Sequence, residues 1–379
     1  MKIIINIGIF FANLIYFFIK LFPTNKNKIT FISRQSNEVT LDFKLLKEEL
    51  LKQNKDLVIK ELCKKLESGI KNKIMYLFHI FAQMYHIATS KVVILDSYCI
   101  PICILKHKKS LTVIQMWHAL GSLKKFGYSS LDTVDGRSSK ISKLMKMHKN
   151  YDYILTSSET SLPNFQEAFN AKKENMVVMN LPRVDYLKSK KIEKELKNEF
   201  YQKYPKVDKK KKIILYCPTS RKNGELPLEE IVSAVNLEKY TLILKLHNNT
   251  NKIYYKPGKY YEKIHFSGMQ MLHVADYIIT DYSAISYEAA ITKKPIYLYI
   301  FDYDKYIDER GLYLNYKKEM PGLISEDINE IIKNIEKNKC NNERTEEFCN
   351  RYIADLKINW TKELAKFVIE KGGIGNEQI

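Results

Sequence analysis

Residues 111–118 read LTVIQMWH, a short apolar run that ends on an aromatic residue and a histidine. Its length and its β-branched residues are typical of a buried parallel strand. Similar runs recur at residues 29–33, 57–62, 91–97, 151–158, 176–182, 212–218, 240–246, 263–267, 276–281 and 295–300. Amphipathic stretches typical of helices lie at residues 40–54, 72–89, 160–170, 226–236, 283–292, 325–337 and 342–371. This alternation predicts an α/β fold with doubly wound, Rossmann-like domains.

The chain of 379 residues is long enough for two such domains. A stretch rich in lysine and glutamate, residues 188–212, interrupts the pattern and is interpreted as a helix plus linker. We therefore expect two domains facing each other across a cleft, the layout of GT-B transferases. The expected bounds are an apolar helix at 1–24, domains at 25–190 and 191–355, and a last helix at 356–379 that could cross back to the first domain.

The composition favours a globular protein with an anionic partner. Hydrophobic residues make up 45% of the chain, which is ample for packed cores, and the formal net charge is +19. Nucleic acid, an anionic membrane and a phosphorylated substrate are the candidate partners; no DNA- or RNA-binding motif is present, which argues against nucleic acid. The six cysteines lack zinc-site or disulfide-framework spacing, which indicates thiols in a reducing compartment.

The N-terminal stretch, residues 3–19, carries no charge. The polar residues Lys2, Asn6, Asn13 and Lys20 fall on one narrow stripe of a helix. We predict a helix that lies in the membrane interface on the cytoplasmic side; a true span and a helix docked on the protein's own core are the alternatives. A basic amphipathic stretch at 138–149 fits either contact with anionic lipid or acceptor, or a solvated helix.

The residues that follow each strand are the candidates for chemistry, because ligands of open α/β sheets bind at the carboxyl ends of the strands. His118 and His247 are candidate catalytic residues, although a lone histidine at a strand end is often structural. Ser283 is expected to cap a helix whose free amides hold a phosphate, and Glu288 to bond ribose hydroxyls; a simple cap and a surface glutamate are the alternatives. Asp302 begins a D-x-D sequence, a weak sign of a metal site that we do not adopt.

Several motifs, in order, resemble one family. They are KITFISRQS (28–36), QMWHALGSLKKFG (115–127), NLPRVD (180–185), CPTSR (217–221), LKLH (244–247), TDYSAISYEAA (280–290) and RGLYLNYKKEMPG (310–322). Together they resemble the CDP-glycerol glycerophosphotransferases of teichoic-acid synthesis, over roughly residues 25–325. The resemblance implies an enzyme that transfers an alditol phosphate from a CDP-alditol to a hydroxyl of a lipid-linked glycan or polyol-phosphate acceptor, with release of CMP and without a cofactor.

The resemblance also implies roles for single residues. His118 matches the family's catalytic base and His247 its second essential histidine. The expected donor contacts are Arg183, Thr219, Ser220, Arg221, Lys245, Asp281, Ser283, Glu288 and Arg310. The expected acceptor side consists of Lys124, Lys125 and Ser158, with no metal ligand. CDP-glycerol is the favoured donor and CDP-ribitol the alternative; a non-catalytic membrane scaffold of the same fold is a second alternative. The oligomeric state is not predicted.

The chain departs from the family pattern directly after His118. The family's usual glycine is Ala119 here, Leu120 is an additional residue, and Gly121-Ser122 replaces threonine-proline. This loop is expected to shape the acceptor side, so the acceptor is expected to differ from a standard teichoic linkage unit.

Overall fold

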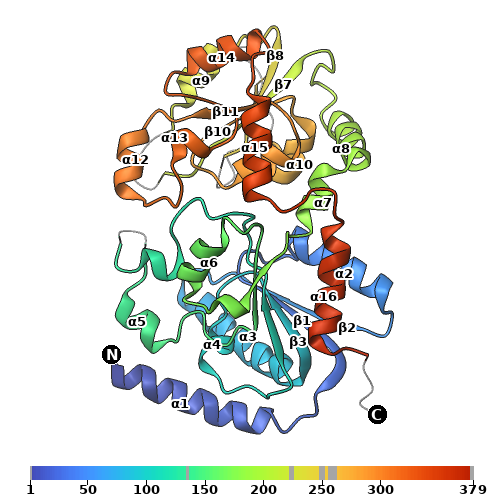
Figure 1. Cartoon of the computed structure of the whole chain (residues 1–379), viewed down its shortest axis with the longest axis vertical. Helices are drawn as coiled ribbons and strands as arrows, with labels where there is room; N and C mark the ends of the chain where they lie inside the picture. Colours follow the sequence, from blue (N-terminus) through green and yellow to red (C-terminus); the bar gives the residue numbers. More distant parts are fainter. Residues whose placement is uncertain (1, 134–135, 222–225, 247–251, 255–262, 376–379) are drawn as a thin grey trace. The chain divides into compact units, whose positions relative to one another are not determined.

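The computed structural model describes residues 2–133, 136–221, 226–246, 252–254 and 263–375 (Figure 1). The chain divides into two compact units. Unit 1 comprises residues 1–119, 125–183 and 356–379, and unit 2 comprises residues 120–124 and 184–355. The chain thus leaves unit 1 for residues 120–124 and again after residue 183. It returns to unit 1 at residue 356.

Unit 1 is built on a sheet of six parallel strands in the order β2-β1-β3-β4-β5-β6. The strands are β1 (Asn25–Ser33), β2 (Val58–Cys63), β3 (Ser90–Leu95), β4 (Thr112–Gln115), β5 (Tyr153–Thr156) and β6 (Met176–Val178). The chain adds β2 on one side of β1 and then continues with β3 on the other side. The point where the strand order reverses, between β1 and β3, is where doubly wound sheets bind ligands.

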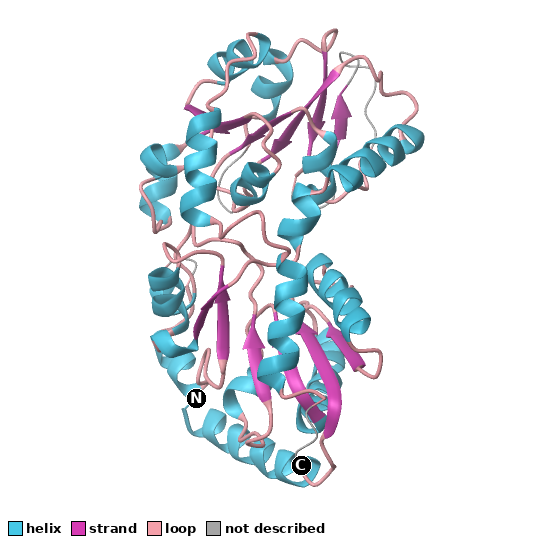
Figure 2. Ribbon diagram, turned by 45° about the vertical axis from the view of Figure 1, so that its right-hand side comes forward, coloured by secondary structure: helices cyan, strands magenta, loops and turns pink. Residues whose placement is uncertain are grey.

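Helices cover both faces of this sheet (Figure 2). Phe31 of β1 packs on Phe43 of α2, with ring centroids 4.7 Å apart, and Ile32 points into the cluster on the opposite face. This alternation follows from the two-residue period of a strand. The helices of unit 1 are α1 (Lys2–Ile19), α2 (Leu41–Gln53), α3 (Ile70–Thr89), α4 (Ile100–Ile104), α5 (Ser139–Leu144), α6 (Leu162–Phe169) and α16 (Trp360–Gly372).

Unit 2 has a second sheet of six strands, in the order β12-β11-β10-β7-β8-β9. Only the β8–β9 pair is antiparallel. The strands are β7 (Lys212–Cys217), β8 (Tyr240–Leu244), β9 (Lys252–Tyr254), β10 (Tyr277–Thr280), β11 (Ile296–Tyr299) and β12 (Leu323–Ser325). The order reverses between β7 and β10, which is the Rossmann switch point.

Helices surround this second sheet as well. They are α7 (Arg183–Lys188), which begins at the last residue of unit 1, α8 (Lys190–Lys203), α9 (Leu228–Ala234), α10 (Gly268–Val274), α11 (Ile285–Ile291), α12 (Tyr303–Glu309), α13 (Tyr316–Glu319), α14 (Ile328–Glu336) and α15 (Asn342–Tyr352). The alternating strands and helices expected from the sequence therefore form two mostly parallel α/β sheets.

Two expectations about single elements are wrong. Residues 263–267 form no strand: Ile264 and Phe266 are buried, Phe266 packs on Phe200 of α8, and Ser267 caps α10. The expected single helix at 342–371 is two helices, α15 and α16, which belong to different units. The helix expected within residues 188–212 is confirmed as α8, which packs against α10, and residues 204–211 connect it to β7.

Candidate active site

His118 lies just beyond the carboxyl end of β4, beside the end of β3. Gln115, the last residue of β4, is fully buried; its amide donates to the carbonyl of Ser97, and its side-chain oxygen accepts the Trp117 N–H at 3.0 Å. The Nδ1 atom of His118 lies 2.7 Å from the carbonyl oxygen of Asp96. The ends of β3 and β4 are therefore joined by side-chain hydrogen bonds that fix the position of the imidazole.

The contact with Asp96 also determines the tautomer of His118. A carbonyl oxygen can only accept, so Nδ1 carries the proton and Nε2 keeps its lone pair. Gln35, after β1, places its amide nitrogen 3.3 Å from the same Nδ1 atom, a longer contact than the one to Asp96. The nitrogen that is free to accept a proton from a substrate is therefore Nε2.

Trp117, directly before His118, has a left-handed backbone conformation with φ of 61°. A bulky residue rarely adopts this conformation, which costs on the order of 1–3 kcal/mol. The indole is held by a stacked contact with Phe126, at 5.0 Å between ring centroids, and an edge contact with Phe169 at 5.1 Å. This packing keeps the backbone in the strained turn that presents His118.

Two titratable groups here have shifted pKa values. Burial lowers the pKa of His118 to about 4, although its hydrogen bond to the Asp96 carbonyl acts in the opposite direction. Burial raises the pKa of the Asp96 carboxyl group to about 6, and only 2% of this residue is exposed. At neutral pH the imidazole is therefore uncharged and able to accept a proton.

Arg183, an expected donor contact, forms an ion pair inside unit 1. Its main-chain N–H and its Nε donate to the carboxylate of Asp42 at 2.9 and 2.8 Å, and Nη2 contacts the same carboxylate. Asp42 lies in the first turn of α2, so the pair ties this helix to the start of α7. These contacts hold the Arg183 guanidinium against α2.

The switch point of unit 2 brings together several of the expected donor residues. Arg221 donates to both carboxylate oxygens of Asp302, at 2.7 and 3.0 Å, and to Asp281 at 2.9 Å. Asp281 also accepts the Thr219 N–H at 2.8 Å. Burial raises the pKa of Asp281, and the positive charge of the Arg221 guanidinium lowers it. The Arg221 side chain is itself 8% exposed. Arg221 thus holds two acidic side chains together, and Asp302 is engaged in this pair.

Lys245 follows β8 in the same sheet and is half-buried. Burial lowers the pKa of its amine, and among the described residues no carboxylate pairs with it. Glu288 of α11 is 2% exposed, so it is not the surface glutamate of the alternative interpretation. Ser220 is exposed at the end of the loop that follows β7.

Ser283 is not the N-cap residue of the following helix. The cap is Ala284, and the Ser283 hydroxyl accepts only the Ile285 N–H, at 3.4 Å. The expected position of the cap is therefore corrected by one residue.

The residues expected on the acceptor side are divided between the two units. Lys124 belongs to unit 2, where its amine lies 5.4 Å from the ring of Tyr306, beside Arg310 at 5.9 Å. Lys125 belongs to unit 1 and is exposed. Ser158 is buried, and its hydroxyl oxygen accepts the Ser161 N–H in the turn before α6. Lys124 therefore belongs to one unit, and Lys125 and Ser158 belong to the other.

The unusual loop after His118 has a structural reason in unit 2. Leu120 and Leu123 are buried, and Lys124 forms a bridge with Leu312. A side chain at Gly121 would place its Cβ 2.0 Å from the ring of Tyr287, so only glycine fits there. The sequence departure therefore reflects packing on α11. The second predicted catalytic histidine, His247, lies outside the described residues.

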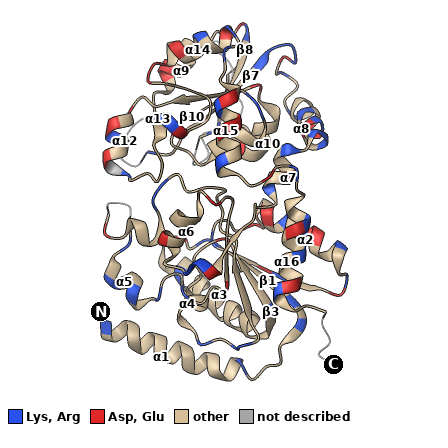
Figure 3. Cartoon of the chain, viewed as in Figure 1, with Lys and Arg blue, Asp and Glu red and all other residues tan. Residues whose placement is uncertain are grey.

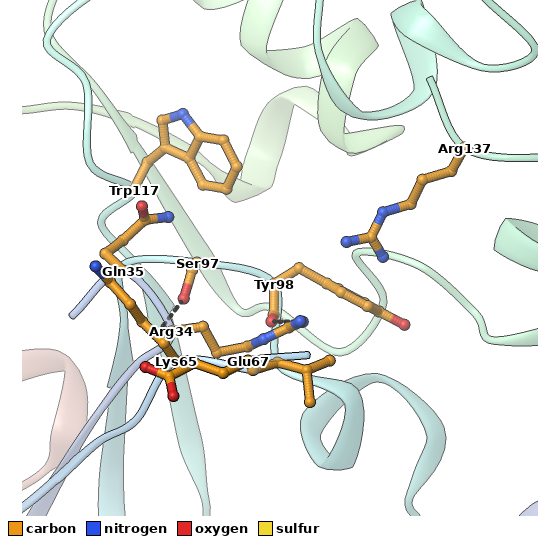
Figure 4. A pocket seen from close by; sticks show the side chains of 9 residues that line it. Arg34, Gln35, Lys65, Glu67, Ser97, Tyr98, Trp117 and Arg137 are labelled. Carbon is orange, nitrogen blue, oxygen red and sulfur yellow. Dashed lines mark hydrogen bonds between the residues drawn. The ribbon is translucent and has the colours of Figure 1, made fainter. Parts of the chain in front are cut away.

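Sequence reasoning missed a pocket of about 480 Å³ beside His118 (Figure 4). Its lining residues are Arg34, Gln35, Lys65, Leu66, Glu67, Ser97, Tyr98, Trp117 and Arg137. The available signal was the position of Arg34 and Ser97 directly after β1 and β3, the two strands at the switch point.

The fold and the strand-end residues define a class: a two-unit α/β protein with a neutral histidine and a cluster of charged residues at the ends of its parallel strands. The sequence matches the family CDP-Glycerol:Poly(glycerophosphate) glycerophosphotransferase over residues 14–355. The chain belongs to this family. It is a CDP-alditol phosphotransferase of the teichoic acid primase and polymerase type.

Individual relatives agree with this assignment. The chain is 32% identical to the teichoic acid ribitol-phosphate primase of Bacillus spizizenii, over 92% of each chain. It is 30% identical to the teichoic acid glycerol-phosphate primase of Bacillus subtilis, over 76% of each chain. Among solved structures it is similar in fold to the wall teichoic acid polymerase TagF, with a TM-score of 0.73 and 18% identity, covering 97% of this chain and 95% of that one.

Proposed function

We propose that the protein transfers an alditol phosphate from a CDP-alditol to a hydroxyl group of a lipid-linked cell-wall or capsule glycopolymer. The acceptor oxygen attacks the phosphorus that carries the alditol, the bond from this phosphorus to the bridging oxygen of CMP breaks, and CMP leaves. The acceptor proton passes to a base. One phosphodiester forms and one anhydride bond breaks, so the reaction balances without water.

The observation that carries this proposal is the state of His118. Its Nδ1–H is bound to the Asp96 carbonyl, and its low pKa leaves Nε2 unprotonated at neutral pH. Such a group accepts a proton from a hydroxyl as the phosphorus–oxygen bond forms. The main-chain carbonyl orients the ring and stabilises the imidazolium that develops.

The donor is assigned to unit 2, around its switch point. Lys245 supplies a half-buried cation for the diphosphate, and the buried carboxylate of Glu288 is suited to ribose hydroxyls. Arg221 and Asp281 hold the loop after β7 in place, and Thr219 and Ser220 of this loop remain candidate donor contacts. A base on one Rossmann-like unit and a donor on the other is the division of roles in GT-B transferases.

Two alditols are candidates. The sequence motifs favour glycerol phosphate, as in the family's name. Ribitol phosphate is the second candidate, and one observation favours it: the likeness to a ribitol-phosphate primase extends over 92% of both chains. The same active-site chemistry serves both donors, because the alditol is attached beyond the phosphorus that reacts.

The protein is also proposed to lie on the cytoplasmic face of the membrane, with α1 in the interface. This helix is 18 residues long, has a mean hydropathy of 2.0 and is long enough to span a bilayer, but it lies along unit 1. The Asn13 side chain donates to the carbonyl of Ile104 and accepts the Lys106 N–H, and the Tyr16 hydroxyl bonds to His107 at 3.0 Å. The polar stripe at Asn13 therefore faces the protein, and the apolar surface faces outward.

Helix α3 extends this apolar surface. It packs beside α1 and exposes Ile70, Ile74, Met75, Leu77, Phe78, Phe81 and Tyr85. Figure 3 shows α1 without charge along nearly all of its length, with basic residues at its two ends. Exposed apolar patches of this kind mark membrane or protein contacts, and flanking lysines favour anionic lipid.

A donor-choice assay tests the enzymatic proposal. The purified protein is incubated with CDP-glycerol or CDP-ribitol and a lipid-linked acceptor, and CMP and product length are measured. We expect acceptor-dependent CMP release with one of the two donors. No CMP release with either donor, from a protein that is folded by circular dichroism, would contradict the proposal and favour the non-catalytic scaffold.

A further inference from the structure

The pocket beside His118 lies at the switch point of unit 1. Arg34 and Gln35 follow β1, Ser97 and Tyr98 follow β3, and Trp117 follows β4. Doubly wound sheets bind ligands at this position, because the loops from neighbouring strands diverge there and leave a crevice. The pocket volume of about 480 Å³ is within the range of small-molecule sites.

The charged residues of the pocket suit an anion. Arg34, Lys65 and Arg137 line it, and among the described residues none of the three forms an ion pair with a carboxylate. Arg34 is oriented by a hydrogen bond from Nη1 to the Tyr98 carbonyl at 3.1 Å, and its Nε is buried without a hydrogen-bond partner. The one acidic residue in the lining is Glu67, which accepts a hydrogen bond from Asn37.

The other walls are aromatic and lie close to the proposed base. Figure 4 shows Trp117 and Arg137 on opposite sides of the open space, with Tyr98 between them along the lower part of the view. The Arg137 guanidinium lies 5.1 Å from the centre of the Tyr98 ring. Gln35, another lining residue, is the residue whose amide lies 3.3 Å from Nδ1 of His118. Aromatic walls with a few cations are suited to a sugar ring that carries phosphate.

The rim of the pocket continues into the apolar surface proposed to face the membrane. Lys65, Leu66 and Glu67 form one wall, and helix α3 begins a few residues later at Ile70. Leu66 is 48% exposed and Ile70 is 80% exposed. An anionic group held here therefore lies beside the residues proposed to contact lipid.

We propose that this pocket binds the phosphate-bearing sugar end of the lipid-linked acceptor. Arg34, Lys65 and Arg137 hold the phosphate groups, and Trp117 and Tyr98 line the sugar. The inference rests on the proposed function and adds to it the acceptor residues, which are not those expected from the sequence. It also identifies the acceptor's phosphate as the group that unit 1 recognises.

The test uses charge reversal at exposed positions in the full-length protein, with Lys65→Glu and Arg137→Glu. Lys55→Glu is the matched control, since Lys55 is an exposed lysine before the other end of β2. Initial rates are measured at saturating CDP-alditol while a synthetic short-chain acceptor with a lipid-diphosphate-linked sugar is titrated. We expect the KM for the acceptor to rise about tenfold or more in both pocket variants, with little change in the control.

Two further measurements separate the alternatives. Donor binding, followed by calorimetry with the CDP-alditol, and sedimentation with phosphatidylglycerol vesicles are expected to stay at wild-type levels. If the wild type turns over and both pocket variants keep its KM for the acceptor, the pocket assignment alone is overturned. If the wild type itself does not turn over, the proposed function is overturned. A rise in KM that only parallels loss of vesicle binding would show that the cations bind lipid headgroups, and would also overturn the assignment.

Discussion

The Nδ1 atom of His118 lies 2.7 Å from the main-chain carbonyl oxygen of Asp96. Because the acceptor in this contact belongs to the backbone, no substitution of the Asp96 side chain removes it. The buried Asp96 carboxyl group, with its raised pKa, is a separate feature of the same turn. The orientation of the proposed base and the charge beside it are therefore open to separate experiments.

His118→Ala is expected to fold normally and to lose transfer by about 10²–10⁴-fold, the usual contribution of a positioned base. A base acts in the transition state, so the affinity for the CDP-alditol should remain near that of the wild type. Single-turnover rates and calorimetry with the donor measure the two quantities. Near-wild-type transfer at saturating substrates would show that His118 is only a structural histidine.

The pH dependence follows from the lowered pKa of His118. The neutral imidazole is the active form, so kcat/KM should stay level down to about pH 5 and fall as the pH drops through about 4. An unshifted histidine would produce this fall near pH 6.5. Asp96→Asn is the control, because it keeps the carbonyl and removes the group that titrates near 6. A fall in kcat/KM near pH 6.5 that persists in Asp96→Asn would contradict the lowered pKa of His118 as the base.

The same shift affects stability. The folded-state pKa of His118 lies below that of the unfolded chain, so the unfolded state binds more protons between about pH 6.5 and 4. The contribution of this residue to stability is therefore complete above that window and is lost as the pH falls through it. Urea unfolding of the wild type and of His118→Ala across this range measures the difference, and parallel curves would contradict it.

Arg221→Ala is expected to destabilise unit 2 by about 3–5 kcal/mol, because it leaves two acidic side chains without their cation. Arg351→Ala is the matched control, since 57% of the Arg351 side chain is exposed in its ion pair with Glu319, which should contribute about 0–1 kcal/mol. Urea unfolding measures both variants. If Arg221→Ala unfolds like the wild type but binds the CDP-alditol more weakly, Arg221 contacts the donor directly.

Lys245→Ala is expected to weaken donor binding by about 1.5–3 kcal/mol, the contribution of a charge-assisted hydrogen bond. Its amine has no carboxylate partner among the described residues, so the folded protein should lose little stability. Calorimetry with the CDP-alditol and with CMP tests this prediction. Unchanged affinity for both ligands would remove Lys245 from the donor site.

Membrane binding is expected to depend on single exposed phenylalanines. Phe10→Ser and Phe78→Ser should each weaken sedimentation with phosphatidylglycerol vesicles by about tenfold or more. Both phenylalanines are exposed, and burial of one such side chain in lipid contributes a free energy of about 1.5–3 kcal/mol. Point variants are preferable to deletion of α1, since Tyr16 is 1% exposed and belongs to the core of unit 1. Val58→Ser, at an exposed apolar position on β2, is the control. If all three variants bind the vesicles as well as the wild type does, the surface of α1 and α3 does not contact the membrane.

The sequence by itself determined the class of fold and the family. Periodic apolar runs of strand length are local features, and they identified eleven strand segments of which only residues 263–267 form no strand. The ordered motifs, including QMWH and CPTSR, identified the chemistry because functional groups follow the strands directly in the chain. The short strands β9 and β12 were missed because neither lies in a longer apolar run, whereas the equally short β6 is part of the run 176–182.

Only the tertiary structure decided what each side chain contacts. Arg183 and Arg221 match family motifs, yet both are engaged by carboxylates distant in sequence, Asp42 in one case and Asp281 and Asp302 in the other. The pocket of Arg34, Lys65 and Arg137 is assembled by the β2-β1-β3-β4 strand order, which places loops far apart in the chain at one edge of the sheet. Pairing between distant residues depends on packing and strand order, and no local pattern encodes either.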